Sequence, residues 1–366
     1  MKFTFERDSF LEKLALSSRF TSSRFSSISS LQGVLLSNKN GELEIRATNL
    51  ISFFKTTEKT QEKSTGSFVI EPRRVVEFLS LLSPGKITME LNEKTVNIAQ
   101  GRTKGAFPLM EAKDFPPTPN FEKEKEEKIK TEFFVKNLPL LLFTTSQDET
   151  RPVLTGVNFL AQDEELALVS TDGFRLSLLK TKKAEGVGSM LISGTFLEET
   201  LRFIKEEKEV GLSVSEKEAV VRLRVGKHEF YSRIIEGEFP PYEKVVPTEH
   251  KTRATLEREE FLKNVKISSV FARDFSNIIL CEFKKSGVTL RPKIDGNNQN
   301  TTTQDAEVSG EEQIVAFNFK FLADFLNHAN AKKITIEVLR PDAPVVFRME
   351  GNKDFLHIIM PVRIQT

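Results

Sequence analysis

Alternating apolar and polar residues occur in three widely separated segments, and each segment predicts a β-strand. The segments are 87–91, 210–214 and 334–338, and in each of them an apolar side chain occupies every second position. The first residues of consecutive segments lie 123 and 124 residues apart. A pattern that returns at a nearly constant interval indicates an internal repeat.

Apolar residues at helical spacing precede each of these strands. They return every three or four positions, and this spacing predicts a helix that buries one face. The three sets are Val75, Leu79 and Leu82; Leu197, Leu201 and Ile204; and Phe319, Leu322 and Leu326. A further helix is predicted near the start of each repeat, at 7–11, 136–140 and 258–262.

The two patterns predict three similar units, each about 122 residues long. Every unit has two helices and several antiparallel strands, so the fold class is α+β with three similar domains, in each of which the helices pack on sheets. We place the domains at 1–125, 126–250 and 251–366.

Polar segments separate and interrupt these units. The first two units close on related four-residue words, Asp-Phe-Pro-Pro at 114–117 and Glu-Phe-Pro-Pro at 238–241. A run of mixed charge at 122–128 follows the first word and predicts a solvated linker or surface turn. The polar stretch 296–304 has no packing pattern, and we interpret it as a mobile loop inside the third unit.

The charge balance excludes one class of nucleic-acid-binding protein. The 366 residues include 53 Lys and Arg and 52 Asp and Glu, which gives a net charge of +1. The molecule is therefore not a basic nucleic-acid binder of the usual kind. If it contacts DNA, positive charge must be gathered locally.

The compartment is predicted from what the chain lacks. The N-terminus has no charged start followed by an apolar run, and no stretch approaches the length of a membrane span, so we expect a cytoplasmic protein. A single cysteine, Cys281, excludes an internal disulfide framework and a multi-cysteine metal site. We expect Cys281 to be a buried strand residue.

No catalytic motif stands out. The four histidines have no spacing that places two on one helix face or one beside a carboxylate; they are His228, His250, His328 and His357. The chain has no glycine-rich phosphate loop and no nucleophile elbow. The sequence Thr171-Asp172-Gly173 is foremost a turn signal. We therefore predict a protein that is not an enzyme and that needs no cofactor and no metal.

Four longer sequence segments resemble those of a known protein family. The segments 147–157, 170–176, 238–242 and 358–364 closely resemble the beta sliding clamps, the processivity subunits of bacterial DNA polymerase III. The likeness extends over essentially the whole chain, including its three-unit layout. It implies a DNA clamp fold, closed into a ring by a head-to-tail homodimer, that encircles duplex DNA and gives polymerases processivity.

The resemblance also implies which residues contact DNA. Such contacts should be directed at phosphates and independent of sequence, because a sliding ring cannot hold one base step more tightly than the next. The expected DNA-binding residues are Arg24, Arg73, Arg74, Gln147, Arg7, Arg202, Lys263 and Lys266.

A second implied site is an apolar cleft between the second and third units that binds short peptides of partner proteins. The implied partners are the DNA polymerase III catalytic subunit, the clamp loader and other proteins with a clamp-binding motif. The expected lining residues are Leu154, Thr171, Gly173, Phe174, Arg175, Leu176, Pro240, Val245, Asn318, Phe321, Ile358, Met360, Pro361, Val362 and Arg363. Phe174 stands where the family often has His, so this cleft should be more apolar than usual.

The expected dimer interface joins Phe107 of the first unit to Val270 and Phe271 of the third.

Two other classes of protein are less consistent with the sequence. A nucleic-acid enzyme would need a cluster of carboxylates for metal ions, and no such spacing is visible. A solenoid adaptor would need repeats of 20 to 50 residues, far shorter than those of this chain.

Overall fold

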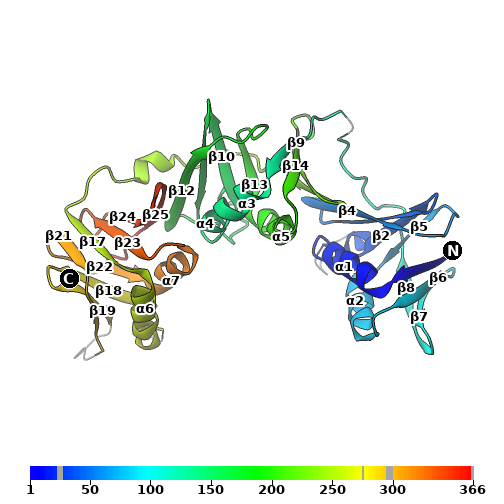
Figure 1. Ribbon diagram of the computed structural model, residues 1–366, viewed down its shortest axis with the longest axis horizontal. Helices are drawn as coiled ribbons and strands as arrows, with labels where there is room; N and C mark the ends of the chain where they lie inside the picture. Colours follow the sequence, from blue (N-terminus) through cyan, green and yellow to red (C-terminus); the bar gives the residue numbers. More distant parts are fainter. Residues whose placement is uncertain (23–27, 122, 274–275, 294–299, 364–366) are drawn as a thin grey trace. The chain divides into compact units, whose positions relative to one another are not determined.

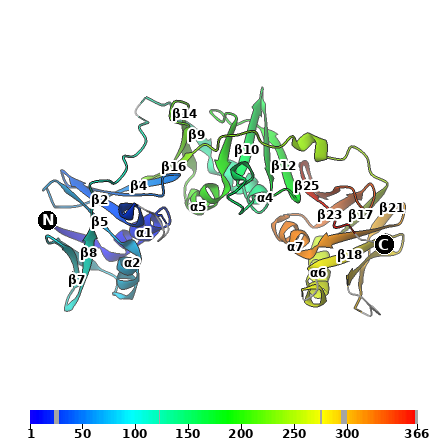
Figure 2. The same cartoon turned by 180° about the vertical axis from the view of Figure 1, so that it is seen from behind.

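The computed structural model describes residues 1–366 except 23–27, 122, 274–275, 294–299 and 364–366. The chain forms two compact units. Unit 1 comprises Met1–Thr131 and Arg202–Ile234, and unit 2 comprises Glu132–Leu201 and Ile235–Thr366. Figures 1 and 2 show the elements of both units from opposite sides.

Unit 1 is built on one antiparallel sheet, which contains twelve strands among the described residues. Their order is β1-β6-β7-β8-β5-β2-β3-β4-β16-β15-β14-β9. The strands are β1 (Lys2–Glu6), β2 (Val34–Lys39), β3 (Glu42–Thr48), β4 (Ser52–Lys59), β5 (Gly66–Ile70), β6 (Lys86–Leu91), β7 (Thr95–Gln100), β8 (Thr103–Met110), β9 (Glu127–Lys130), β14 (Glu209–Ser215), β15 (Val220–Val225) and β16 (His228–Arg233).

Unit 2 contains two antiparallel sheets. In the described part of the chain their orders are β13-β10-β11-β12-β25-β24-β23-β17-β21 and β20-β19-β18-β22. The strands are β10 (Gly156–Gln162), β11 (Glu165–Thr171), β12 (Arg175–Lys182), β13 (Met190–Ser193), β17 (Thr252–Glu257), β18 (Ile278–Lys284), β19 (Gly287–Pro292), β20 (Thr302–Gln304), β21 (Glu307–Gly310), β22 (Gln313–Asn318), β23 (Lys333–Val338), β24 (Val345–Met349) and β25 (Asn352–Ile359).

The helices cover these sheets in pairs. The α-helices are α1 (Arg7–Ser18), α2 (Pro72–Leu81), α3 (Thr131–Asn137), α4 (Pro139–Leu142), α5 (Gly194–Ile204), α6 (Arg258–Ala272) and α7 (Phe319–His328), and the short 3-10 helices are η1 (Ser29–Gln32), η2 (Pro152–Leu154) and η3 (Tyr242–Val245). Helix α1 packs on α2, and α6 packs on α7. The core between helices and sheet is rich in phenylalanine; Phe5 and Phe10, for example, stack with ring centroids 4.9 Å apart.

The repeat predicted from periodicity is confirmed. The three alternating segments are the strands β6, β14 and β23, and the helices α2, α5 and α7 precede them. The opening helix of the second repeat differs from the prediction because it is divided into α3 and α4. Pro139 lies at the division, and its ring leaves no backbone N–H for a helical hydrogen bond.

Two further predictions concern the polar segment 296–304 and the bounds of the three domains. The segment 296–304 was expected to be a loop; residues 296–299 lie outside the described residues, and Thr302–Gln304 forms the strand β20. The domain bounds 1–125, 126–250 and 251–366 stay a prediction. Strand β4 of the first repeat pairs with β16 of the second, from Ser52↔Ser232 to Lys55↔Glu229, so contacts of the backbone alone do not divide the chain at those bounds.

Candidate functional site

A tight turn between β11 and β12 organises an apolar cleft in unit 2. The Thr171 hydroxyl donates to the Arg175 carbonyl over 2.6 Å and accepts from the Gly173 amide over 3.0 Å. One carboxylate oxygen of Asp172 accepts from the amides of Phe174 and Arg175 over 2.9 and 3.0 Å. Gly173 has a φ of +92°, where a side chain would be strained. The turn signal read from the sequence is therefore a turn with a fixed backbone.

The cleft beside this turn has a volume of 490 Å³ and is lined mainly by apolar side chains. It lies wholly within unit 2. The lining residues are Arg151, Val153, Leu154, Thr171, Gly173, Phe174, Arg175, Leu176, Pro240, Pro241, Tyr242, Val245, Ile358 and Met360.

The floor of the cleft belongs to the hydrophobic core. Leu176 of β12 and Ile358 of β25 are direct cross-strand partners, and both are buried. Tyr242 packs against the core cluster that contains them. The Met360 amide donates to the Phe174 carbonyl over 2.8 Å, which fastens the chain after β25 to the turn. A ligand in the cleft would thus meet a rigid apolar surface.

Arg175 supports one wall of the cleft. Its side chain is only 10% exposed, and it donates to Asp172 over 2.9 Å and to Asp324 over 2.6 Å. Its guanidinium lies 4.7 Å from the ring centre of Phe321. The positive charge is therefore neutralised, and the side chain is held in place by charge-assisted hydrogen bonds and an aromatic face.

Phe174, on the rim of the cleft, is exposed over 59% of its surface. Its ring stacks on that of Phe321 with centroids 6.3 Å apart. The apolar character expected from Phe174 is thus present on the rim, where an incoming side chain would first touch the protein. Phe321 itself lies behind the rim.

Ten of the fifteen residues expected in the cleft line it. The others have different surroundings: Asn318 caps α7, Phe321 supports Phe174, and Pro361, Val362 and Arg363 follow β25, where the Val362 amide donates to the Ala316 carbonyl over 2.8 Å. Sequence reasoning missed Arg151, Val153, Pro241 and Tyr242, which also line the cleft. Each of them lies within three residues of a predicted lining residue, Leu154 or Pro240. Closeness in sequence to these residues could therefore have predicted that they line the cleft.

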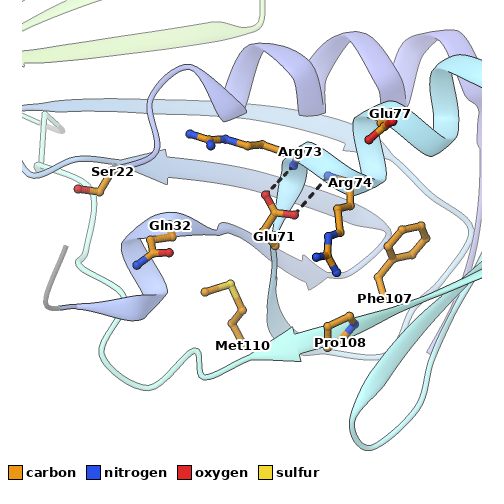
Figure 3. Close-up of a pocket in the computed structure, with 9 residues that line it drawn as sticks. All are labelled: Ser22, Gln32, Glu71, Arg73, Arg74, Glu77, Phe107, Pro108 and Met110. Atoms are coloured by element: carbon orange, nitrogen blue, oxygen red, sulfur yellow. Dashed lines mark hydrogen bonds between the residues drawn. The ribbon is translucent and has the colours of Figure 1, made fainter. Parts of the chain in front are cut away.

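Unit 1 has a pocket of 630 Å³ at the start of α2 (Figure 3). It is lined by Ser22, Gln32, Glu71, Arg73, Arg74, Glu77, Phe107, Pro108 and Met110. The Glu71 carboxylate caps the helix by accepting from the amides of Arg73 and Arg74 over 3.0 and 3.2 Å. Figure 3 shows the two arginine side chains leaving the helix in different directions, with Arg74 on the side of Phe107.

This pocket brings together residues to which the sequence assigned separate roles. Arg73 and Arg74 were expected to contact DNA, whereas Phe107 was expected in the dimer interface, and all three line the same pocket. Phe107 is half-buried and meets Phe78 edge to face, with ring centroids 5.5 Å apart. On α2, Leu81 is almost fully exposed.

Helix α6 of unit 2 carries a second set of exposed residues. Ile267, Val270 and Phe271 are exposed apolar residues on this helix. Lys263 and Lys266, both expected to contact DNA, are exposed on the same helix. The remaining faces of α6 are buried, with Phe261 and Val265 in the core.

The other expected DNA-binding residues have mixed surroundings. Gln147 and Arg202 are exposed. The Arg7 side chain is only 12% exposed and pairs with Asp8 over 3.0 Å, so little of it can reach a phosphate. Arg24 lies outside the described residues.

The titratable groups of the described residues form no group of three or more metal-ligating side chains. Burial raises the pKa of the Cys281 thiol, which is a strand residue in the core as expected. Beneath the cleft, burial holds the pKa of His357 well below its ordinary value, and its ring lies 3.0 Å from the Ser177 hydroxyl. No helix among the described residues is both long and apolar enough to cross a membrane.

Comparison with known proteins gives consistent matches along the chain. Three family models match in order: the N-terminal domain of the DNA polymerase III beta subunit over residues 1–119, its central domain over 128–241 and its C-terminal domain over 243–363. The beta sliding clamp of Bacillus subtilis is 26% identical over 99% of this chain and 100% of its own length. That of Treponema pallidum is 25% identical over the whole of both chains.

Solved structures show the same fold. The DNA polymerase III beta subunit of Thermotoga maritima aligns with a TM-score of 0.91 at 24% identity, covering 100% of both chains. The DNA polymerase sliding clamp of Bacillus subtilis aligns with a TM-score of 0.90 at 23% identity, also over 100% of both chains. Because three models of one family together cover almost all of the sequence, the chain belongs to the DNA polymerase III beta subunit family, the beta sliding clamps.

Proposed function

We propose that two copies of this chain close head to tail into a ring around duplex DNA, and that the cleft of unit 2 tethers polymerases and other DNA-processing proteins to that ring. As a beta sliding clamp, the chain is a non-catalytic processivity factor of DNA polymerase. The observation that carries the proposal is the ordered series of three clamp-domain matches, over residues 1–119, 128–241 and 243–363.

The exposed apolar residues support the head-to-tail contact. Leu81 of unit 1 and Val270 and Phe271 of unit 2 are exposed, whereas Phe107 of unit 1 is half-buried. Exposed apolar groups that gather on one surface mark interaction sites. A contact between two different surfaces of identical chains forms a ring when the rotation closes, and two such contacts would close a dimer.

DNA contact would use the exposed polar residues of the helices and loops. Arg73, Arg74, Gln147, Arg202, Lys263 and Lys266 are exposed, and with Arg24 they form the proposed DNA-binding set. Arg7 is not included, because its side chain is only 12% exposed and is paired with Asp8. Contacts to phosphates hold no sequence information, as a sliding ring requires. Because the net charge is only +1, residence on DNA would depend on encirclement more than on electrostatic attraction.

The cleft would bind short apolar segments of partner proteins. Its rigid floor of Leu176 and Ile358 favours aliphatic or aromatic side chains, and its neutralised Arg175 adds no net charge. We propose as partners the catalytic subunit of DNA polymerase III, the clamp loader and other proteins with such a segment. A protein with these partners would work in the cytoplasm.

A primer-extension assay with polymerase and loader from the same organism tests this function. The wild-type chain should lengthen the products made in one binding event, whereas Phe174→Asp should shorten them, because a carboxylate on the rim opposes apolar docking. Glu350→Gln, which changes an exposed residue outside the cleft, serves as the control. Equal product lengths with and without the chain would overturn the proposed function.

A further inference from the structure

The turn that organises the cleft of unit 2 occurs a second time, in unit 1, between β3 and β4. The Thr48 hydroxyl donates to the Ser52 carbonyl over 2.9 Å and accepts from the Leu50 amide over 2.9 Å. The Asn49 side-chain oxygen accepts from the amides of Ile51 and Ser52 over 3.1 and 2.7 Å. Each of these four bonds has its counterpart in the turn 171–175.

The surroundings of the two turns also correspond. In unit 1 the Arg233 amide donates to the Ile51 carbonyl over 2.9 Å, as the Met360 amide does to the Phe174 carbonyl. Phe53 and Tyr231 are buried cross-strand partners, as Leu176 and Ile358 are in unit 2. Unit 1 thus repeats the scaffold of the cleft.

The floor of this second copy is covered by the chain itself. Phe121 is buried in one cluster with Phe53 and Tyr231, and its ring centre lies 5.6 Å from that of Tyr231. The Arg222 guanidinium lies 5.0 Å from the Phe121 ring centre. The surface that remains for a partner is therefore the turn, where Leu50 and Ile51 are 40% and 56% exposed.

Leu50 is unusual in its backbone as well as in its exposure. Its φ is +75°, at the position where the other turn has Gly173 with a φ of +92°. A bulky side chain in this region costs conformational free energy that glycine avoids. Core packing does not account for a leucine that is both strained and exposed. Residues held in strained backbone conformations cluster at active sites, ligand-binding sites and switch regions.

The charge at this turn differs from that in unit 2. Arg233 is exposed, its Nε donates to the Leu50 carbonyl over 2.9 Å, and its two terminal nitrogens have no partner among the described residues. In unit 2 both nearby cations are already paired, Arg175 with two carboxylates and Arg151 with Asp148 over 3.4 Å. The turn of unit 1 therefore presents two apolar side chains beside a guanidinium that can donate hydrogen bonds to a carboxylate.

We propose that the turn 48–52 is a second docking surface, which binds an apolar segment of a partner protein that carries a carboxylate. The analogy with the cleft rests on the proposed function of unit 2, whereas the exposure, the strain and the charge are observations on unit 1 alone. A partner could then hold the clamp at two places, and each of them would select a different charge next to its apolar side chains.

Two fluorescein-labelled peptides test the proposal on the full chain: Gly-Leu-Ile-Asp-Leu-Gly, and the same peptide with Lys in place of Asp. Anisotropy titration should give two sites per chain for the Asp peptide. Leu50→Gly combined with Ile51→Ser should leave one site and weaken the other at least tenfold. Leu50→Gly alone should keep or raise the melting temperature, which separates lost contact from lost folding.

A cleft variant, Phe174→Asp, separates this proposal from the proposed function. If Phe174→Asp does not change binding of the Asp peptide while the turn variant removes a site, the result contradicts peptide docking in the cleft and supports the second docking surface. If the turn variant binds the Asp peptide with the affinity and stoichiometry of the wild type, the second surface is overturned. Absence of binding up to about 1 mM overturns it too, and equal binding of the Lys peptide at the turn overturns its charge preference.

Discussion

Arg175 is the residue on which the wall of the cleft depends most. It joins the turn after β11 to α7 through Asp172 and Asp324, and it is almost completely buried. Removing one partner of a buried ion pair leaves uncompensated charge behind. The shape of the cleft and the stability of unit 2 are therefore linked through one side chain.

We expect Arg175→Leu to lower the free energy of unfolding by about 2 to 3 kcal/mol, because the largely buried Asp172 carboxylate loses its partner. Asp324 is 43% exposed and adds little, because water solvates it. Arg340→Leu is a matched control, since Arg340 pairs over 2.8 Å with Asp342 but both side chains are exposed. It should cost less than about 1 kcal/mol. Urea unfolding of both variants measures the difference, and equal losses would contradict the role given to Arg175.

His228 should make unit 1 sensitive to acid. Burial among the rings of Phe54, Phe203 and Phe230, together with Lys13 and Lys227, lowers its pKa from 6.5 to about 4. Its Nδ1 is buried and has no hydrogen-bond partner among the described residues. The unfolded chain therefore binds a proton at His228 more readily than the folded chain does. Above about pH 6.5 His228 has no effect on the free energy of unfolding, and as the pH falls from there toward 4 it lowers that free energy.

The expected loss from this group is at most about 1.4 kcal/mol per pH unit in that range. His228→Phe removes the titrating group and keeps an aromatic ring among the neighbouring phenylalanines. The variant should therefore lose less stability than the wild type between pH 7 and pH 5, as followed by denaturant unfolding at each pH. Parallel losses in the two proteins would show that His228 does not titrate as described.

At the scale of elements, the caps of the two helices that flank the sites differ in kind. Glu71 begins α2 beside the pocket of unit 1, and Asn318 begins α7 behind the cleft of unit 2. Asn318 accepts from the Lys320 amide over 3.0 Å. The family resemblance implied that Asn318 lines the cleft, whereas its contact in this chain is with its own helix.

Asn318→Ala should therefore lower the free energy of unfolding by about 1 kcal/mol, the usual loss when a helix cap is removed. Asn318→Asp keeps an oxygen at the cap and should stay close to the wild type. Neither change should alter the affinity of a cleft-binding peptide more than about twofold. A tenfold loss of peptide affinity in the folded Asn318→Ala variant would restore this residue to the cleft lining.

Periodicity was enough to predict the strands β6, β14 and β23 and the helices before them, because each buries one face and repeats a local pattern. It could not predict that β4 pairs with β16, since pairing between distant edge strands leaves no local signal. The cleft was predicted through family likeness at residues such as Leu154 and Met360. Tyr242 was missed, because its place in the lining depends on how the segment after Pro241 folds.

At the scale of the whole molecule, some exposed apolar residues belong to the proposed contact between chains and others do not. Val270 and Phe271 lie on α6, Leu81 lies on α2, and Ile314 lies on β22. The first three belong to the proposed contact between chains, whereas Ile314 does not. This difference supplies a matched pair of substitutions.

Val270→Asp should convert the dimer to a monomer, because the contact would bury an unpaired carboxylate. Light scattering after gel filtration should then give 41.6 kDa in place of twice that mass. Ile314→Asp, also at an exposed apolar residue, should leave the dimer intact. A dimer that survives Val270→Asp at micromolar concentration would place the interface elsewhere.

We propose that the protein holds DNA by encircling it. The most direct test is retention on nicked circular DNA after loading, compared with the same DNA made linear, at raised salt. Charge contacts weaken with salt whether or not the DNA has ends. We expect the protein to stay on circular DNA and to be lost from linear DNA, whereas equal loss from both in the presence of a competent loader would contradict encirclement.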